Sequence, residues 1–203
     1  MPRNRELSRQ MRDERREQIL STALKLFATR GLVATKIKDI ASEAGIAQGL
    51  FYHYYRSKEE IFVELLKNAF EKMKIAALAL EKLPMSPLQK IRTALEKMLQ
   101  SLEENEDFSR SFLFITQAAV SEAIPSEAKD IIRSKSYAHY EVIDRIIIAG
   151  QKEGSIKNFN SRDLTLVFWT SLNGLAINKA IRGTEFRVPD CDILMQLFAA
   201  DNN

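Results

Sequence analysis

Residues 35–55 read TKIKDIASEAGIAQGLFYHYY. Two short amphipathic helices are predicted here, joined at Ala44-Gly45-Ile46, because apolar residues recur at a helical period on both sides of the glycine. Glycine readily takes the left-handed conformation that a sharp turn between helices needs. The pattern is typical of a helix-turn-helix, whose first helix braces the second while the second presents its N-terminal residues to the major groove of DNA.

Several side chains in and around the second helix suit DNA. Gln48 can pair with a base edge, best with adenine, Gly49 permits a close backbone approach, and Leu50 can touch a thymine methyl group. Donors to phosphate are present as well, and helix N-termini add partial positive charge. The predicted phosphate donors are Thr35, through its hydroxyl, Lys36, Tyr52, His53 and Lys58.

Each of these features also has a purely structural explanation. Gln48 suits a solvated surface equally well, and helical hairpins that contain a glycine are common. The aromatic run from Phe51 to Tyr55 is expected to place two or three of its five rings in the core, with Phe51 and Tyr55 pointing inward. The spacing alone therefore leaves DNA binding and a plain helical hairpin both open.

Charge is distributed unevenly along the 203 residues. Residues 1–58 carry twelve Lys and Arg and six Asp and Glu, a net charge of +6, whereas residues 59–203 have a net charge of −3. Such an asymmetry is expected where one module meets a polyanion and the other does not, although a solvated basic helix face gives the same totals. We predict two domains, a DNA-binding domain over 1–58 and a second domain over 59–203.

The composition favours an all-α fold. Seven Gly and five Pro are too few for a turn-rich sandwich or barrel and suit long helices. Apolar periodicity predicts about nine helices and no strand. Their approximate ranges are 8–30, 35–44, 47–53, 57 to the break at 83–87, 86–102, 108–120, 125–153, 161–182 and 189–199.

Capping residues mark several helix ends. Pro87 suits the first position of a helix, and the charged segment 9–16 is expected to project beyond the core. The predicted N-caps are Thr35, Ser57, Ser86 and Ser161.

Several classes of protein are disfavoured. Cys191 is the single cysteine, which excludes an internal disulfide and a zinc knuckle. His53 and His139 are the only histidines, and with one cysteine they form no metal triad or Cys–His pair with an obvious spacing. No glycine-rich phosphate loop is present. We therefore expect no enzyme, no metal and no cofactor. With no run of 18 apolar residues and a charged N-terminus unlike a secretory signal, we expect no membrane partner and a cytoplasmic location.

The longer stretch 31–61, GLVATKIKDIASEAGIAQGLFYHYYRSKEEI, closely resembles the N-terminal domain of TetR-family transcriptional repressors. The matching positions are Gly31, Thr35, Asp39-Ile40-Ala41, Ala44-Gly45-Ile46, Gly49, the run Phe51 to Tyr55, and Ser57-Lys58-Glu59. The resemblance implies an all-α homodimer with a ligand-binding C-terminal domain. It also implies a recognition helix at Ala47 to Tyr52 and phosphate contacts from Thr35, Tyr52 and Lys58.

Three positions depart from the family pattern. Ala47 stands where serine or threonine is common, Leu50 where threonine is common, and Arg56 where proline is common. Ala47 removes a hydroxyl contact, and Leu50 makes the base readout less polar. The resemblance therefore implies the family but not a particular operator.

The C-terminal region is expected to bind a small hydrophobic or aromatic effector in an apolar cavity, with no clustered basic group for an anionic ligand. Aromatic residues at helical spacing are also what an ordinary core contains. The predicted lining is Met98, Phe108, Phe112, Phe114, Tyr137, Tyr140, Phe168 and Trp169, with His139 and Asn173 as polar groups.

By analogy with the family, the last two predicted helices hold a homodimer, although their apolar faces also suit one more core layer in a monomer. The predicted interface is Leu172, Leu175, Ala176, Leu194, Leu197 and Phe198. The function expected from these features is that of a one-component repressor released from a palindromic double-stranded DNA operator by its effector. The alternative is an architectural DNA-binding protein of the same fold that senses no small molecule.

Overall fold

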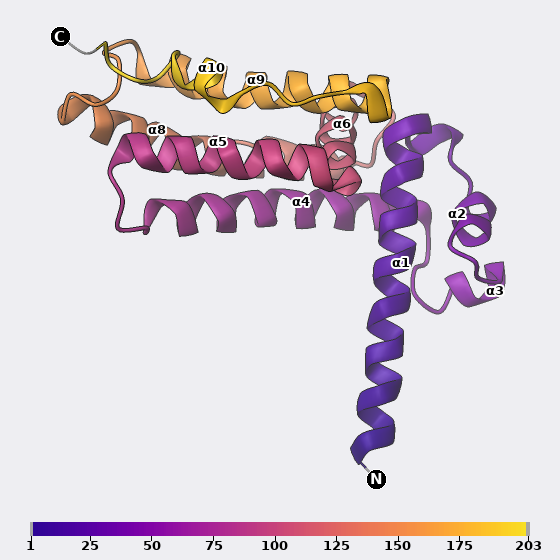
Figure 1. Ribbon diagram of the computed structural model, residues 1–203. Coiled ribbons are helices and arrows are strands. Elements are labelled where there is room, and N and C mark those ends of the chain that lie inside the picture. The colour runs from indigo at the N-terminus through magenta and orange to yellow at the C-terminus, as the bar shows by residue number, and fades with distance from the viewer. Residues whose placement is uncertain (1, 202–203) are drawn as a thin grey trace.

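The computed structural model describes residues 2–201, which are helical apart from turns, loops and an isolated β-bridge between Ile156 and Ala199. Ten α-helices and one short 3-10 helix follow one another in these residues (Figure 1). They are α1 (Pro2–Ala34), α2 (Ile37–Glu43), α3 (Gln48–Phe51), α4 (Lys58–Glu81), α5 (Pro87–Glu104), α6 (Glu106–Val120), α7 (Ser126–Lys135), α8 (Ala138–Lys152), α9 (Ser161–Arg182), η1 (Gly183–Glu185) and α10 (Cys191–Met195).

The helices form a bundle with a projecting head, which consists of α1, α2 and α3. Helices α4, α5, α8 and α9 extend along the bundle, and α10 lies at its outer side (Figure 1). Helix α1 leaves the bundle at a steep angle and packs on α4 and α6, while α2 and α3 lie at its side (Figure 1). Residues 9–14 of α1 are exposed to solvent, which confirms the projection of this part of the charged segment, whereas Arg16 at its end forms an ion pair with Glu64 of α4.

Two apolar clusters hold the molecule together. The first joins α1, α2, α3 and the start of α4 to α6 and α7, with Phe62 stacked edge-on against Phe27 and Phe114 at ring-centroid distances of 5.4 and 4.8 Å. The second joins the end of α4 to α5, α6, α8, α9 and α10 around Leu95 and Phe168. The N-terminal helices thus share their core with helices that follow residue 58.

Side-chain caps begin two of the bundle helices where the sequence predicts them. The Ser57 hydroxyl accepts a hydrogen bond from the Glu60 N–H at the start of α4. The Ser86 hydroxyl accepts one from the Gln89 N–H at the start of α5, with Pro87 in the first helical position. Each cap satisfies a backbone donor that has no partner inside its helix.

Two other predicted caps are wrong. Helix α2 follows Lys36 rather than Thr35, and the Asp39 carboxylate accepts the Lys36 backbone N–H at 3.2 Å. Helix α9 includes Ser161 as its first residue and is capped by Asn160, whose side-chain oxygen accepts two backbone N–H groups of the first turn.

The predicted helix 125–153 is wrong as a single element. It is divided into α7 and α8 at Ser136 and Tyr137, both of which keep nearly helical backbone angles. The first part packs in the cluster around Phe27 and the second in the cluster around Phe168, so the break falls where the chain passes from one core to the other. No glycine or proline marks this break, and the apolar period continues across it.

None of the helices within residues 2–201 is long and apolar enough to span a membrane.

Candidate DNA interface and effector cavity

A sharp turn connects α2 to α3. Gly45 has a φ of +64°, a conformation that residues with a side chain rarely adopt. The Ile46 N–H donates to the Ala41 carbonyl at 2.9 Å, and Phe51 is buried against this turn in the first apolar cluster. These contacts fix the orientation of α3 on α2, as a helix-turn-helix requires.

The residues expected to meet DNA bases are exposed in the structure. These are Ala47, Gln48, Gly49 and Leu50, together with the neighbouring Tyr52 and His53. Phe51 and Tyr55 are buried and Tyr54 is half-buried, which confirms that two or three of the five rings belong to the core. One side of α3 is therefore held by the protein, and the other is open for a partner.

Two predicted phosphate donors serve the fold instead. Thr35 is fully buried, and its hydroxyl donates to the Gly31 carbonyl at 2.7 Å. The Lys58 ammonium donates to the carbonyls of Leu32 and Val33 in the last turn of α1 and of Thr35 just after it, at 2.7, 3.2 and 2.8 Å. An ammonium has three N–H donors, so all of them are used. In this structure both groups are engaged within the protein, and their phosphate contacts stay predictions.

Basic residues that were not singled out from the sequence are also available for DNA. Lys38 is exposed on α2, close in sequence to the exposed Lys36. Arg9 and Arg12 are exposed on the projecting part of α1, which extends past α3 in Figure 1. The net charge of residues 1–58 is the signal that could have identified them.

The head is connected to α4 by a small polar cluster. Arg16 forms an ion pair with Glu64 at 2.7 Å, and its guanidinium lies 5.8 Å from the centre of the Tyr55 ring. The Tyr55 hydroxyl donates to Glu64 at 3.4 Å, and burial together with that carboxylate raises the pKa of Tyr55. The neutral phenol and the ion pair therefore tie α1 to the first half of α4.

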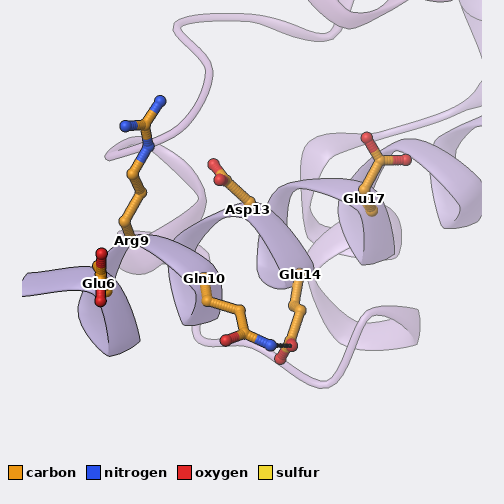
Figure 2. Close-up of a pocket in the computed structure, with 6 residues that line it drawn as sticks. All are labelled: Glu6, Arg9, Gln10, Asp13, Glu14 and Glu17. Carbon is orange, nitrogen blue, oxygen red and sulfur yellow. Dashed lines mark hydrogen bonds between the residues drawn. The ribbon is translucent and has the colours of Figure 1, made fainter. Parts of the chain in front are cut away.

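An open groove follows the exposed N-terminal part of α1 (Figure 2). All six lining residues come from this one helix, and four of them are acidic. Gln10 donates to Glu14 at 3.1 Å, while Arg9 and Asp13 point away from that pair (Figure 2). A groove with one wall of charged residues lacks the enclosure that a small-molecule site needs. We assign it no ligand.

A cavity of about 490 Å³ lies among α4, α5 and α6 and reaches α8 and α9. Its volume falls in the range of small-molecule sites, and its lining is mostly apolar. The lining residues are Ala69, Lys72, Met73, Ala76, Ala77, Ala79, Leu80, Leu83, Ala94, Lys97, Met98, Phe108, Ser111, Phe112, Ile143, Phe168 and Trp169.

Half of the predicted lining is found at this cavity: Met98, Phe108, Phe112, Phe168 and Trp169. The structure places the other five residues elsewhere. Phe114 lies in the first apolar cluster, with its ring centroid 6.3 Å from that of Phe27 and 4.8 Å from that of Phe62. Tyr137 is 68% exposed at the break between α7 and α8.

His139, Tyr140 and Asn173 are not part of the lining either. The ring centroids of His139 and Tyr140 lie 4.6 and 5.5 Å from that of Trp169, so both rings pack against a residue that lines the cavity. His139 is 4% exposed, and burial lowers its pKa to about 4. A neutral imidazole therefore supports Trp169, in place of the predicted ligand contact.

The contribution of α4 was missed from the sequence. Ala69, Met73, Ala76 and Leu80 recur at helical spacing and line the cavity, and the small alanines leave room that larger residues would fill. A run of alanines at this spacing is the signal that a search for aromatic residues overlooks. The expectation that no basic groups gather here is wrong, since two lysines belong to the lining.

The predicted dimer interface divides into buried and exposed residues. Leu172, Ala176 and Phe198 are buried in this chain's own second cluster, as the alternative of one more core layer expects, and their role in an interface stays a prediction. Leu175 and Leu194 are partly buried against the same cluster, while Leu197 is 43% exposed. The opposite face of α9 carries Leu166, Val167, Thr170, Gly174, Ile177 and Ile181, all exposed or half-buried.

This outer face is apolar at helical spacing, and Leu166 and Ile181 are 53% and 76% exposed. A helix that is apolar all round is expected to be covered on both sides. The apolar residues of the inner face of α9, such as Leu172 and Ala176, were recognised in the sequence from their helical spacing. Those of the outer face, such as Leu166 and Ile181, were not. Among the described side chains, no three His, Cys, Asp or Glu residues gather as metal ligands would.

Comparisons with known proteins agree with this architecture. The family of bacterial regulatory proteins named after tetR matches residues 19–65, from the core of α1 into α4. The transcriptional repressor KstR2 of Rhodococcus jostii is 31% identical over 149 residues, which cover 71% of this chain and 69% of that protein. Among solved structures, the MbdR regulator of Azoarcus sp. CIB has a TM-score of 0.76 at 20% identity, covering 89% of this chain and 95% of that one. The complex of SmeT with triclosan has a TM-score of 0.71 at 13% identity, covering 93% of each chain.

One family assignment follows from the helix-turn-helix, the helical bundle packed against it and the sequence identity to KstR2. The chain belongs to the TetR family of transcriptional regulators, which bind DNA through this helix-turn-helix.

Proposed function

We propose that the protein is a one-component repressor that binds a palindromic operator as a homodimer and is released from it by a small hydrophobic effector. Residues 1–58 bind DNA, and residues 59–203 bind the effector and the second subunit, in the cytoplasm. The supporting observation is the position of α4: Lys58 at its start holds the end of α1, and Ala76 and Ala77 in its second half line the cavity.

The proposed release follows from the continuity of α4. The helix runs without a break from Lys58 to Glu81, so a ligand that displaces its cavity wall also tilts its N-terminal end. Two recognition helices must lie about 34–36 Å apart to enter successive major grooves. A ligand that binds only a wider dimer shifts the population away from DNA, and a switch from 99:1 to 1:99 needs a difference of about 5.5 kcal/mol.

The apolar lining favours a sensor over an architectural DNA-binding protein, because an architectural protein needs no cavity. The solved complex of SmeT with triclosan supports a hydrophobic effector in this fold. The outer face of α9 is the proposed dimer contact, because Leu166 and Ile181 leave apolar surface on the bundle that the chain itself does not cover.

The DNA-binding part is tested by selecting duplexes from a random pool. We expect enrichment of a near-palindrome with half-sites one helical turn apart. Gln48→Ala should relax base preference by about 1–3 kcal/mol if its contact is bidentate. Gln196→Ala, on the exposed surface after α10, is the matched control and should leave the selected sequence unchanged. A pool without any enriched sequence would contradict the proposed function.

A further inference from the structure

The cavity is elongated along α4. Its lining extends on this helix from Ala69 to Leu80, about 16 Å of helix axis, and continues to Leu83 in the turn that leads to α5. Ile143 and Trp169 approach from α8 and α9. A space of this shape favours a long, narrow ligand over a compact one.

Two lysines reach the cavity at the same level. Helices α4 and α5 are antiparallel neighbours joined by a short turn (Figure 1). Lys72 lies about 14 Å along the helix axis before the end of α4 at Glu81. Lys97 lies about 15 Å along the helix axis after the start of α5 at Pro87. Both side chains are exposed, so their stems line the cavity while their ammonium groups stay near solvent.

The remaining lining carries no charge. Ser111 is the one other lining residue with a polar side chain, besides the indole of Trp169, and no Asp or Glu is present. Among the ion pairs of the described residues, none involves the ammonium of Lys72 or Lys97. The cavity therefore has positive charge where Lys72 and Lys97 lie, and apolar walls between these lysines and the turn that joins α4 to α5.

We propose that the effector is an elongated amphipathic anion. Its charged group binds Lys72 and Lys97, and its apolar chain extends past Ala76 and Leu80 toward Leu83. This assignment rests on the proposed function. It replaces the general hydrophobic effector of that proposal with an anion that has a long apolar chain. Charge-assisted hydrogen bonds to the two ammonium groups supply the preference for an anion.

The test compares dodecanoate with 1-dodecanol, which has the same chain length and no charge, below the concentrations at which either aggregates. Binding is measured through the fluorescence of Trp169, the single tryptophan, which lines the cavity. We expect the wild-type protein to bind dodecanoate about tenfold more tightly than the alcohol, as suits charged hydrogen bonds at a partly exposed site. Operator release is measured in parallel with both compounds.

The double variant Lys72→Gln/Lys97→Gln should lose the preference for the acid and keep its affinity for the alcohol. Lys74→Gln, an exposed lysine of α4 outside the lining, is the matched control and should keep the preference. Equal binding of acid and alcohol by the wild type would overturn the anion assignment and leave a hydrophobic effector standing. Preferential binding of the acid without any effect on operator affinity would support an anion site at Lys72 and Lys97 and contradict the proposed repressor function. Binding of neither compound would overturn the anion assignment.

Discussion

The helix-turn-helix and the proposed effector cavity differ in how their residues are distributed along the chain. The residues of the helix-turn-helix fall within 35–55, whereas the cavity draws on five helices between Ala69 and Trp169. A short motif carries its turn, caps and exposed side chains in consecutive residues, so its geometry is local. A cavity forms only where packing leaves space, and that depends on small residues such as Ala76 as much as on large ones.

The largest expected effect concerns the outer face of α9, the proposed dimer contact. Ile181→Glu places a charge in the proposed dimer contact, where burial without a partner is costly. Light scattering should give twice the chain mass of 23.2 kDa for the wild type and the single mass for the variant. Operator affinity should fall on the order of a hundredfold or more, because two linked half-sites are lost.

Lys129→Glu on the exposed surface of α7 makes the same kind of change away from α9 and should leave the dimer intact. A variant Ile181→Glu that remains dimeric would show that another surface holds the two subunits.

The next prediction concerns how the stability of the protein depends on pH, and it compares His139 in the bundle with His53 in the head. Burial lowers the pKa of His139 to about 4 from the usual 6.5, so the unfolded chain binds a proton between these values while the native protein does not. Stability is thus retained above pH 6.5 and lost as the pH falls toward 4, by about 3 kcal/mol in all. Denaturant unfolding of His139→Phe should lack this loss. His53→Gln, an exposed change in the head, should unfold like the wild type at each pH, and equal pH profiles for all three proteins would contradict the prediction.

A smaller effect tests how the head is held. Lys58→Met keeps the aliphatic stem and removes the three donors at the end of α1, which should lower the free energy of unfolding by about 1–3 kcal/mol. Lys38→Met, an exposed change on α2, should leave it within about 0.5 kcal/mol of the wild type. If Lys58→Met unfolds like the wild type but its operator binding depends less on salt, Lys58 contacts phosphate and the capping role is wrong.

The smallest effect concerns single phosphate contacts. Lys36→Ala and Tyr52→Phe should each reduce the slope of log affinity against log salt, by about 0.9 for each full phosphate charge neutralised and by less for the uncharged phenol. Gel-shift titrations at several salt concentrations measure this slope. Lys74→Ala, on α4, should leave the slope unchanged, and an unaltered slope in the Lys36 variant would remove that residue from the interface.

The fold class and most of the helices could be predicted from the sequence because capping and periodicity are local. Ser57, Ser86 and Gly45 act on their own helix ends, and each has the predicted role. The division of α7 from α8 could not be predicted, since no residue there departs far from helical angles and the two helices pack in separate cores.

The site shows the same contrast. The exposure of Gln48 and Tyr52 follows from their motif, whereas the hydrogen bonds of Lys58 within the protein depend on where the end of α1 lies. Phe114 and Phe112 are equally aromatic in the sequence, yet only Phe112 lines the cavity, because α6 lies between the two clusters and turns one ring to each.

The central claim is that α4 couples the cavity to the DNA-binding head, and the most direct test measures that coupling from both ends. Dodecanoate affinity is determined through Trp169 fluorescence with and without saturating operator, and operator affinity with and without saturating dodecanoate. Coupling between two binding sites is reciprocal, so the two factors must be equal, and we expect them to lie between about 5 and 150. Dodecanoate binding at Trp169 that is unchanged by the operator would contradict the account.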